Sequence, residues 1–404
     1  MDILTKSIFM FTRLSSLASK PFLLVLMTQD DAVQADVLAL IFSAVASSFV
    51  ILSNNNHRDY YSGFLNEETL VENHRFLYYV KTQLLHTFIF FPFVILVSIY
   101  WANFSILIAC SICIFVLLEK FFDEEMRLLI YRKKFKRWCL ALSLKLLFPF
   151  CAYLAISYIY SFHSYYLYFI LSLASFSAYI CFSVGPRFLF LVVKGILKLK
   201  EYDFAKYLKD YKARYFSYHL WAFLSANVIL IDRLFIARVG SVGELSTYTS
   251  VAMLSNSVLV MHRVIFVEER RHTLVDVQSL KQTVHHIKNW TYPLLLVFLV
   301  FLGFLILSTL NLLDMPGNYW LVSALLAAGY LNSVSSILLE WCFWHGKILT
   351  LCLVDCCMLL MGALTMAMMT NYVEIATVLT VMLAGRLCVL LLYSANVKET
   401  ASHV

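Results

Sequence analysis

The sequence predicts an all-α membrane protein of twelve transmembrane helices in two halves of six. Hydrophobic residues make up 61% of the 404 residues and charged residues only 14%, whereas a soluble domain carries about 25% charged residues. The mean hydropathy is +0.77. The apolar stretches run for roughly 20 residues without alternating polarity, and hydrocarbon satisfies no backbone hydrogen bonds. They therefore predict spanning helices rather than barrel strands.

The individual spans follow from these apolar stretches. The first stretch runs to Met27 without a small-residue cleavage site, so we interpret it as a retained span and not as a signal peptide. The spans are placed at residues 7–27, 32–54, 82–100, 103–119, 138–160, 165–185, 216–238, 245–262, 291–312, 319–342, 348–370 and 374–393. All ten cysteines lie within or at the ends of these spans, which is typical of buried free thiols rather than of disulfides or a metal site.

The connections between spans alternate in charge and thereby predict the orientation. The short connections after the first, third, fifth, seventh, ninth and eleventh spans contain no lysine or arginine. Of the 32 Lys and Arg residues, six lie within spans, which leaves 26 for the other connections and the two termini. By the positive-inside rule, those connections and both termini are cytoplasmic.

The longest internal connection divides the chain into two predicted six-helix bundles, residues 1–186 and 215–404. Residues 187–214 are apolar and then basic, which favours an amphipathic linker helix on the cytoplasmic membrane surface. Basic segments of this kind are expected to contact anionic lipids, so the net charge of +7 needs no nucleic acid to explain it. A layout of six plus six spans is typical of secondary transporters with internal duplication.

The sequence contains little that predicts enzymatic catalysis. No G-x-x-x-x-G-K-[ST] phosphate loop occurs, and we predict no catalytic residue, cofactor or metal site. Asp30 and Asp31, in the first outer connection, have two interpretations. Multi-span glycosyltransferases acting on lipid-linked sugars use such acids to hold a metal or as a base, but they also have long outer loops, which this chain lacks. Otherwise the two acids cap the following helix.

Charged residues inside the spans carry the functional prediction. A charge at mid-bilayer costs about 2.5–3.5 kcal/mol on insertion scales and marks a functional site by default. Lys6, Arg13 and Lys20 are seven residues apart, so they follow one face of the first span. Cations in later spans include Lys145, Arg233 and Arg386.

Against five or so buried cations, few acids are expected to be buried. We count Asp232, Asp355 and Glu340, the last near the inner end of its span. The surplus of cations predicts a water-filled cavity with positive potential that binds an anionic guest, and arginine binds phosphate through two parallel hydrogen bonds. The alternative is that these residues form salt bridges that join helices, with Asp232 and Arg233 as a plain ion pair.

The segment "NVILIDRLFIARVGSVGELSTYTSVAML" at 227–254 resembles the start of the second half of bacterial polysaccharide flippases. These are the O-antigen and capsule repeat-unit translocases of the multidrug/oligosaccharidyl-lipid/polysaccharide exporter superfamily. The matching residues are Asn227, Asp232, Arg233, Glu244 and Tyr248. Ser246 stands where the family usually has glycine. The motif is confined to this segment, and the twelve-span layout extends the likeness over the chain.

The resemblance implies two six-helix bundles that form a V around a central cationic cavity. It implies that undecaprenyl-pyrophosphate-linked oligosaccharide moves from the inner to the outer leaflet of the bacterial cytoplasmic membrane by alternating access, driven by a proton or sodium ion gradient. A polysaccharide polymerase is a further expected partner. The expected substrate contacts are Arg13, Lys20, Lys145, Arg233 and Arg386. Asp232 and Asp355 are the expected ion-coupling residues.

Three other functions compete with this prediction. The main alternative is a multi-span glycosyltransferase or polymerase that acts on lipid-linked sugars. A drug or small-cation exporter of the same superfamily would need more buried acids than buried bases, which is the reverse of the pattern here. A structural scaffold would not need six basic residues within its spans.

Overall fold

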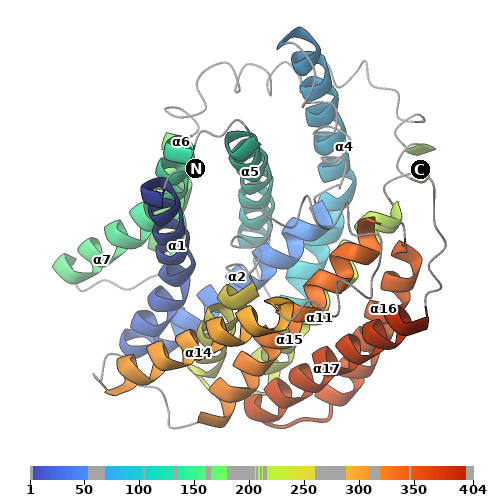
Figure 1. Ribbon diagram of the computed structural model, residues 1–404. Helices are drawn as coiled ribbons and strands as arrows, with labels where there is room; N and C mark the ends of the chain where they lie inside the picture. Colours follow the sequence, from blue (N-terminus) through green and yellow to red (C-terminus); the bar gives the residue numbers. More distant parts are fainter. Residues whose placement is uncertain are drawn as a thin grey trace. The chain divides into compact units, whose positions relative to one another are not determined.

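The chain is all-α wherever the computed structural model describes it. Described are residues 3–52, 69–102, 105–131, 135–160, 165–179, 216–259, 288–309, 319–344 and 347–396, with 205, 208, 209 and 212. These residues form helices and contain no β-strand (Figure 1). The predicted linker, 187–214, lies almost entirely outside them.

The helices fall into two series along the chain. The first comprises α1 (Ile3–Asp30), α2 (Ala32–Leu52), α4 (Thr69–Ala102), α5 (Ile106–Tyr131), α6 (Phe135–Leu142), the π-helix η1 (Ser143–Leu147), α7 (Phe148–Tyr160) and α8 (Tyr165–Tyr179). The second comprises α11 (Phe216–Val239), a helix at 244–259, α14 (Lys288–Thr309), α15 (Tyr319–Trp344), α16 (Ile348–Met366) and α17 (Tyr372–Asn396).

The protein is a multi-pass membrane protein. Within the described residues, seven helical segments are long and apolar enough to cross a membrane. They are Ala32–Leu52, Gln83–Tyr100, Lys136–Tyr160, Phe216–Val239, Tyr319–Leu339, Ile348–Met366 and Tyr372–Tyr393. The other five predicted spans overlap helices that are shorter or less uniformly apolar, so the count of twelve stays a prediction.

The chain forms two compact units. Unit 1 contains residues 1–19 and 40–226, and unit 2 contains 20–39 and 227–404, so that they meet in sequence within α11. The two six-helix bundles at 1–186 and 215–404 stay a prediction. The segment 20–39 belongs to unit 2 because its side chains hydrogen-bond to the turn before the helix at 244–259 and to the start of that helix. No local sequence pattern predicts this contact.

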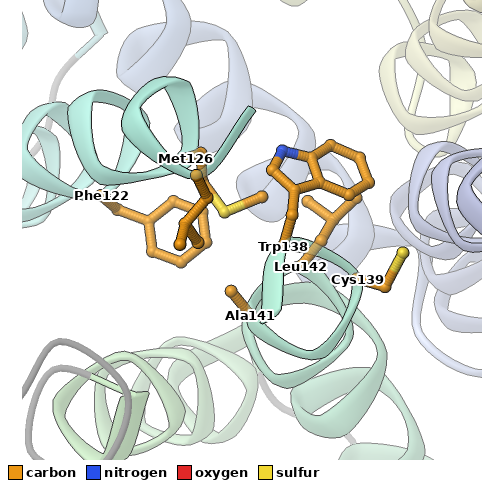
Figure 2. Packing of buried hydrophobic residues seen from close by; sticks show 7 residues of the cluster. Phe122, Met126, Trp138, Cys139, Ala141 and Leu142 are labelled. Atoms are coloured by element: carbon orange, nitrogen blue, oxygen red, sulfur yellow. The ribbon is translucent and has the colours of Figure 1, made fainter. Parts of the chain in front are cut away.

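In unit 1, an apolar cluster packs α5 against α6 (Figure 2). Its buried members are Phe122, Met126, Leu129, Trp138, Cys139, Ala141 and Leu142. The aromatic and sulfur-containing side chains supply most of the apolar area that is buried here. This packing fixes the start of η1 beside α5.

Also in unit 1, three side chains cap the C-terminus of α2. The last carbonyl groups of a helix lack intrahelical partners, and hydrocarbon offers none. Gln83 Nε2 donates to the Leu52 carbonyl at 2.6 Å. His86 Nε2 lies 3.1 Å from the Ile51 carbonyl oxygen, and His219 Nε2 lies 3.2 Å from that of Val50. The two imidazole rings pack edge to face, with centroids 4.7 Å apart. The end of α2 is therefore held by both α4 and α11.

Unit 2 is organised around α15, which packs against α14, α16 and α17. Over the most apolar stretch of α15, 72% of the residues are buried, a larger share than in any other candidate span of the described residues. Small residues such as Gly329 permit this, since membrane helices pack closely where side chains are small. A Cβ atom added to Gly329 would lie 2.6 Å from the Ser255 carbonyl oxygen. The helix at 244–259 therefore contacts α15 almost backbone to backbone.

Candidate functional site

The candidate site is built on the helical hairpin of α11 and the helix at 244–259, in unit 2. The connecting turn is short and contains Gly243, whose φ of 89° favours glycine. The Glu244 carboxylate accepts a hydrogen bond from the Ser241 N–H at 2.8 Å, which caps the second helix. A short turn between helices makes them antiparallel neighbours. Asp232 and Tyr248 stand equally far from Gly240, so the hairpin brings them side by side.

The Asp36 carboxylate of α2 fixes the same turn. It accepts hydrogen bonds from the N–H groups of Gly243 at 2.7 Å and Ser246 at 2.8 Å. Thr28 of α1 donates to the Ser246 hydroxyl at 2.8 Å. A negative charge at a helix N-terminus is favoured by the helix dipole. Asp36 therefore anchors the hairpin that carries the site.

Asp232 is fully buried and hydrogen-bonded within the hairpin. Its carboxylate accepts a hydrogen bond from the Tyr248 hydroxyl at 2.5 Å and another from the Arg233 N–H at 2.8 Å. Arg233 is also buried, at 3% exposure. Two residues of the quoted motif, sixteen positions apart, thus meet through a direct contact between Asp232 and Tyr248.

Asp232 lines a small cavity between α11, the helix at 244–259, α15 and α17. The volume is about 10 Å³, which is room for about one water molecule or one desolvated small ion. The lining residues are Ile229, Asp232, Ala252, Ser255, Asn256, Leu325, Ala328, Gly329, Leu379 and Leu383. Within the part of the chain that the structure describes, the buried Ser255 hydroxyl has no hydrogen-bond partner.

The polar groups on this cavity suit a hard cation or a proton. The Asp232 carboxylate, the Ser255 hydroxyl and the Asn256 amide all offer oxygen atoms, the ligands that hard cations prefer. The remaining lining is apolar, so water has little competing access. Of the residues around this cavity, the sequence predicted Asp232 as a site residue and gave Tyr248 only as a match to the motif. It did not indicate Ser255, Asn256 or Gly329, because serine and glycine are ordinary at membrane helix contacts.

Two other predicted site residues, Asp355 and Arg386, are partners of each other. Arg386 Nε lies 2.7 Å from Asp355 Oδ1, and Arg386 Nη2 donates to Asp355 Oδ2 at 2.7 Å. Both side chains are 0% exposed. This two-point ion pair joins α16 to α17. The roles of Arg386 in substrate binding and of Asp355 in ion coupling stay predictions, and the structure shows the two groups bound to each other.

The remaining predicted cations are distributed over both units. Lys145 of η1, in unit 1, forms an ion pair with Glu119 at 2.7 Å. Lys20, in α1, is half-buried and belongs to unit 2. Arg13 also lies in α1, but its side chain falls outside the described residues, as does that of Glu340.

Asp31 caps α2, as the second interpretation predicted. Its Oδ1 accepts a hydrogen bond from the Gln34 N–H at 3.1 Å, three residues into the helix. That role explains why an acid stands at this position of the outer connection.

The chain matches no protein family model, no curated protein and no solved structure. Its function is therefore argued from its own residues.

The close contact at Gly329 gives a test of the packing around the cavity. Gly329→Ala is expected to lower stability by about 1–3 kcal/mol, because the added methyl group meets the Ser255 backbone and the helices must separate. The melting temperature of the purified protein in detergent measures the effect. Gly303→Ala in α14 is the matched control, since no atom lies within 4 Å of its added Cβ. Equal melting temperatures for the two variants would contradict the contact.

Proposed function

We propose that this protein is a flippase that moves undecaprenyl-pyrophosphate-linked oligosaccharide, an O-antigen or capsule repeat unit, from the inner to the outer leaflet of the bacterial cytoplasmic membrane. The observation that carries the proposal is the buried Asp232 beside Tyr248 on an ion-sized cavity. An intramembrane acid lining a cavity is expected in an ion-coupled transporter. Both residues belong to the segment that resembles polysaccharide flippases.

The proposed architecture has twelve spans in two six-helix bundles, with both termini in the cytoplasm. Seven apolar helices within the described residues and helices on the other five predicted ranges support this count. The proposed central cavity is cationic and exposed to each side of the membrane in turn. Alternating access needs two stable units, and the division of the chain into two compact units is in keeping with it.

The proposed coupling ion is a proton or a sodium ion, and it binds at Asp232. Asp355 is left out of this role because Arg386 already contacts both of its carboxylate oxygens. The proposed substrate contacts are Arg13, Lys20, Lys145 and Arg233, since cations inside the membrane complement a pyrophosphate headgroup.

The proposal is tested by reconstitution. The purified protein is placed in liposomes with a polyprenyl-pyrophosphate glycan that carries a fluorescent sugar, and dithionite bleaches the label on the outside. We expect the protected inner pool to become accessible at a rate that increases with an ion gradient. Gly303→Ala, which lies outside the proposed site, should behave as the unchanged protein does.

A cellular measurement separates the main alternative from the proposal. In cells without the protein, complete lipid-linked repeat units should accumulate on the cytoplasmic leaflet. Truncated glycans would instead indicate a glycosyltransferase, and complete but unpolymerised units on the outer leaflet would indicate a polymerase. An inner pool that stays protected in the liposomes would overturn the flippase directly.

A further inference from the structure

The π-helix η1 is a local widening of the helix that a proline causes. Pro149 has no N–H, so it cannot donate to a carbonyl in the preceding turn. The Phe148 N–H donates to the Ser143 carbonyl, five residues back, instead of four. Single π-turns within α-helices are rare and occur often at functional sites. Lys145 stands in the middle of this turn.

A serine on α8 completes the widened turn. With the Phe148 N–H used by Ser143 and no N–H on Pro149, the carbonyl of Leu144 is left without a donor from its own helix. The Ser175 hydroxyl donates a hydrogen bond to that carbonyl. A neighbouring hydroxyl is one of the ways in which a membrane helix satisfies backbone groups that a proline has freed. The widened turn is thus stabilised by one hydrogen bond within its own helix and by one from α8.

This geometry directs Lys145 onto α5. Lys145 Nζ lies 2.7 Å from Glu119 Oε1 and 4.4 Å from the centroid of the Phe122 ring. Phe122 in turn belongs to the apolar cluster that packs α5 against α6 (Figure 2). The ammonium group therefore has a fixed position, with one carboxylate and one aromatic face against it.

The Lys145–Glu119 pair differs from the Asp355–Arg386 pair in accessibility. The side chains of Lys145 and Glu119 are 12% and 20% exposed, whereas those of Arg386 and Asp355 are 0% exposed. The Lys145 contact has one point and the Arg386 contact has two. A charged pair with open surface inside a membrane protein faces a wet interior, because exposure to hydrocarbon is too costly. Lys145 is thus the cation of the two that an incoming anion can reach.

We propose that Glu119 is a displaceable counter-anion. In the resting protein it neutralises Lys145, and an anion of the phosphate class takes its place on the lysine when it binds. Glu119 thereby sets the affinity of the anion site, and Ser175 and Pro149 position the lysine. The role in transport rests on the proposed function, but the exchange of anions at Lys145 does not.

Binding of inorganic pyrophosphate to the purified full-length protein tests this exchange, by calorimetry in nanodiscs of zwitterionic lipid. Glu119→Gln removes the competing charge and keeps the size, so pyrophosphate affinity is expected to rise about fivefold to tenfold. Lys145→Gln should abolish binding, and Lys145→Arg should retain it. Nanodiscs that contain polyprenyl phosphate distinguish the source: weaker pyrophosphate binding there shows that a lipid headgroup occupies the same site.

The control is Asp123→Asn, which removes the same charge one turn further along α5. It should change the affinity less than twofold. If the affinity for pyrophosphate rises equally in both variants, the effect is general electrostatics and not exchange at Lys145. An unchanged or weaker affinity in a folded Glu119→Gln protein would overturn the proposal. So would the absence of pyrophosphate binding in all variants. A purely structural role predicts a lower melting temperature with no gain in affinity. If the liposome assay shows no flipping but Glu119→Gln still raises the affinity for pyrophosphate, the proposed flippase function fails and the anion site remains.

Discussion

Asp355→Asn is expected to lower the stability of the protein by about 3–5 kcal/mol, because it leaves the charge of Arg386 buried without its carboxylate. Both side chains are inaccessible and joined at two points of 2.7 Å each. Arg386→Leu should cost a similar amount, since it strands the acid instead of the base. The melting temperature of the purified protein in detergent measures both changes.

The paired replacement distinguishes a structural ion pair from a substrate site. Replacing both Asp355 and Arg386 by leucine and methionine removes two desolvated charges at once, and buried pairs exchanged in this way often leave stability unchanged or raise it by about 1–4 kcal/mol. We expect the double variant to melt near the unchanged protein and to retain flipping. Glu374→Gln, in the exposed first turn of α17, is the matched acid-to-amide control. A stable double variant that no longer flips the substrate would indicate that Arg386 binds the substrate.

The helices themselves could be predicted because hydrocarbon leaves a long apolar stretch few alternatives to a helix. The apolar pattern does not indicate where a helix ends. The fourth predicted span ends at residue 119, whereas α5 continues through the charged segment "EKFFDEEMR" to Tyr131. Glu119 is the last residue of that predicted span. Its contact with Lys145 depends on how α5 and η1 pack, which the sequence does not indicate.

Asp232 could be predicted because an acid is conspicuous in an apolar stretch. Tyr248 was known only as a match to the motif, and its contact with Asp232 was not predicted. The rest of the cavity could not be predicted. Gly329 lies on α15, 97 positions after Asp232, and nothing local indicates which helix covers the hairpin. Likewise, the side-chain cap on α2 joins His86 to His219 across 133 positions, and single histidines in apolar segments have no recognisable pattern.

The predicted excess of buried cations also needs revision once contacts are known. The charges in the sequence left two outcomes open, a surplus of cations around a cavity or salt bridges that join helices. In the structure, Arg386 has Asp355 and Lys145 has Glu119 as a carboxylate partner. Two of the five predicted substrate cations thus have a carboxylate partner, and access of an anion to Lys145 depends on whether it displaces Glu119.

Asp232→Asn is expected to abolish the stimulation of flipping by an ion gradient, a loss of about 5- to 150-fold at the coupling energies usual for linked sites. Asparagine keeps the shape of the cavity and an oxygen acceptor for the Tyr248 hydroxyl, so the fold should persist. Only the charge that would hold a proton or a sodium ion disappears. Flipping without a gradient should continue, because a carrier that has lost its ion site still equilibrates its substrate. The liposome assay with and without an imposed gradient measures the difference.

Arg233 decides between ion coupling and a plain ion pair. If Asp232 only neutralises Arg233, then replacing Asp232 by asparagine and Arg233 by glutamine removes the two charges together, and gradient-driven flipping should return. If Asp232 binds the coupling ion, the double variant stays uncoupled, because no second carboxylate lines the cavity. Ser255→Ala supplies an independent measure, since it removes an oxygen from the cavity without touching a charge. A weaker response to sodium but not to protons in that variant would assign the cavity to sodium, since a proton needs one acceptor and a sodium ion needs several.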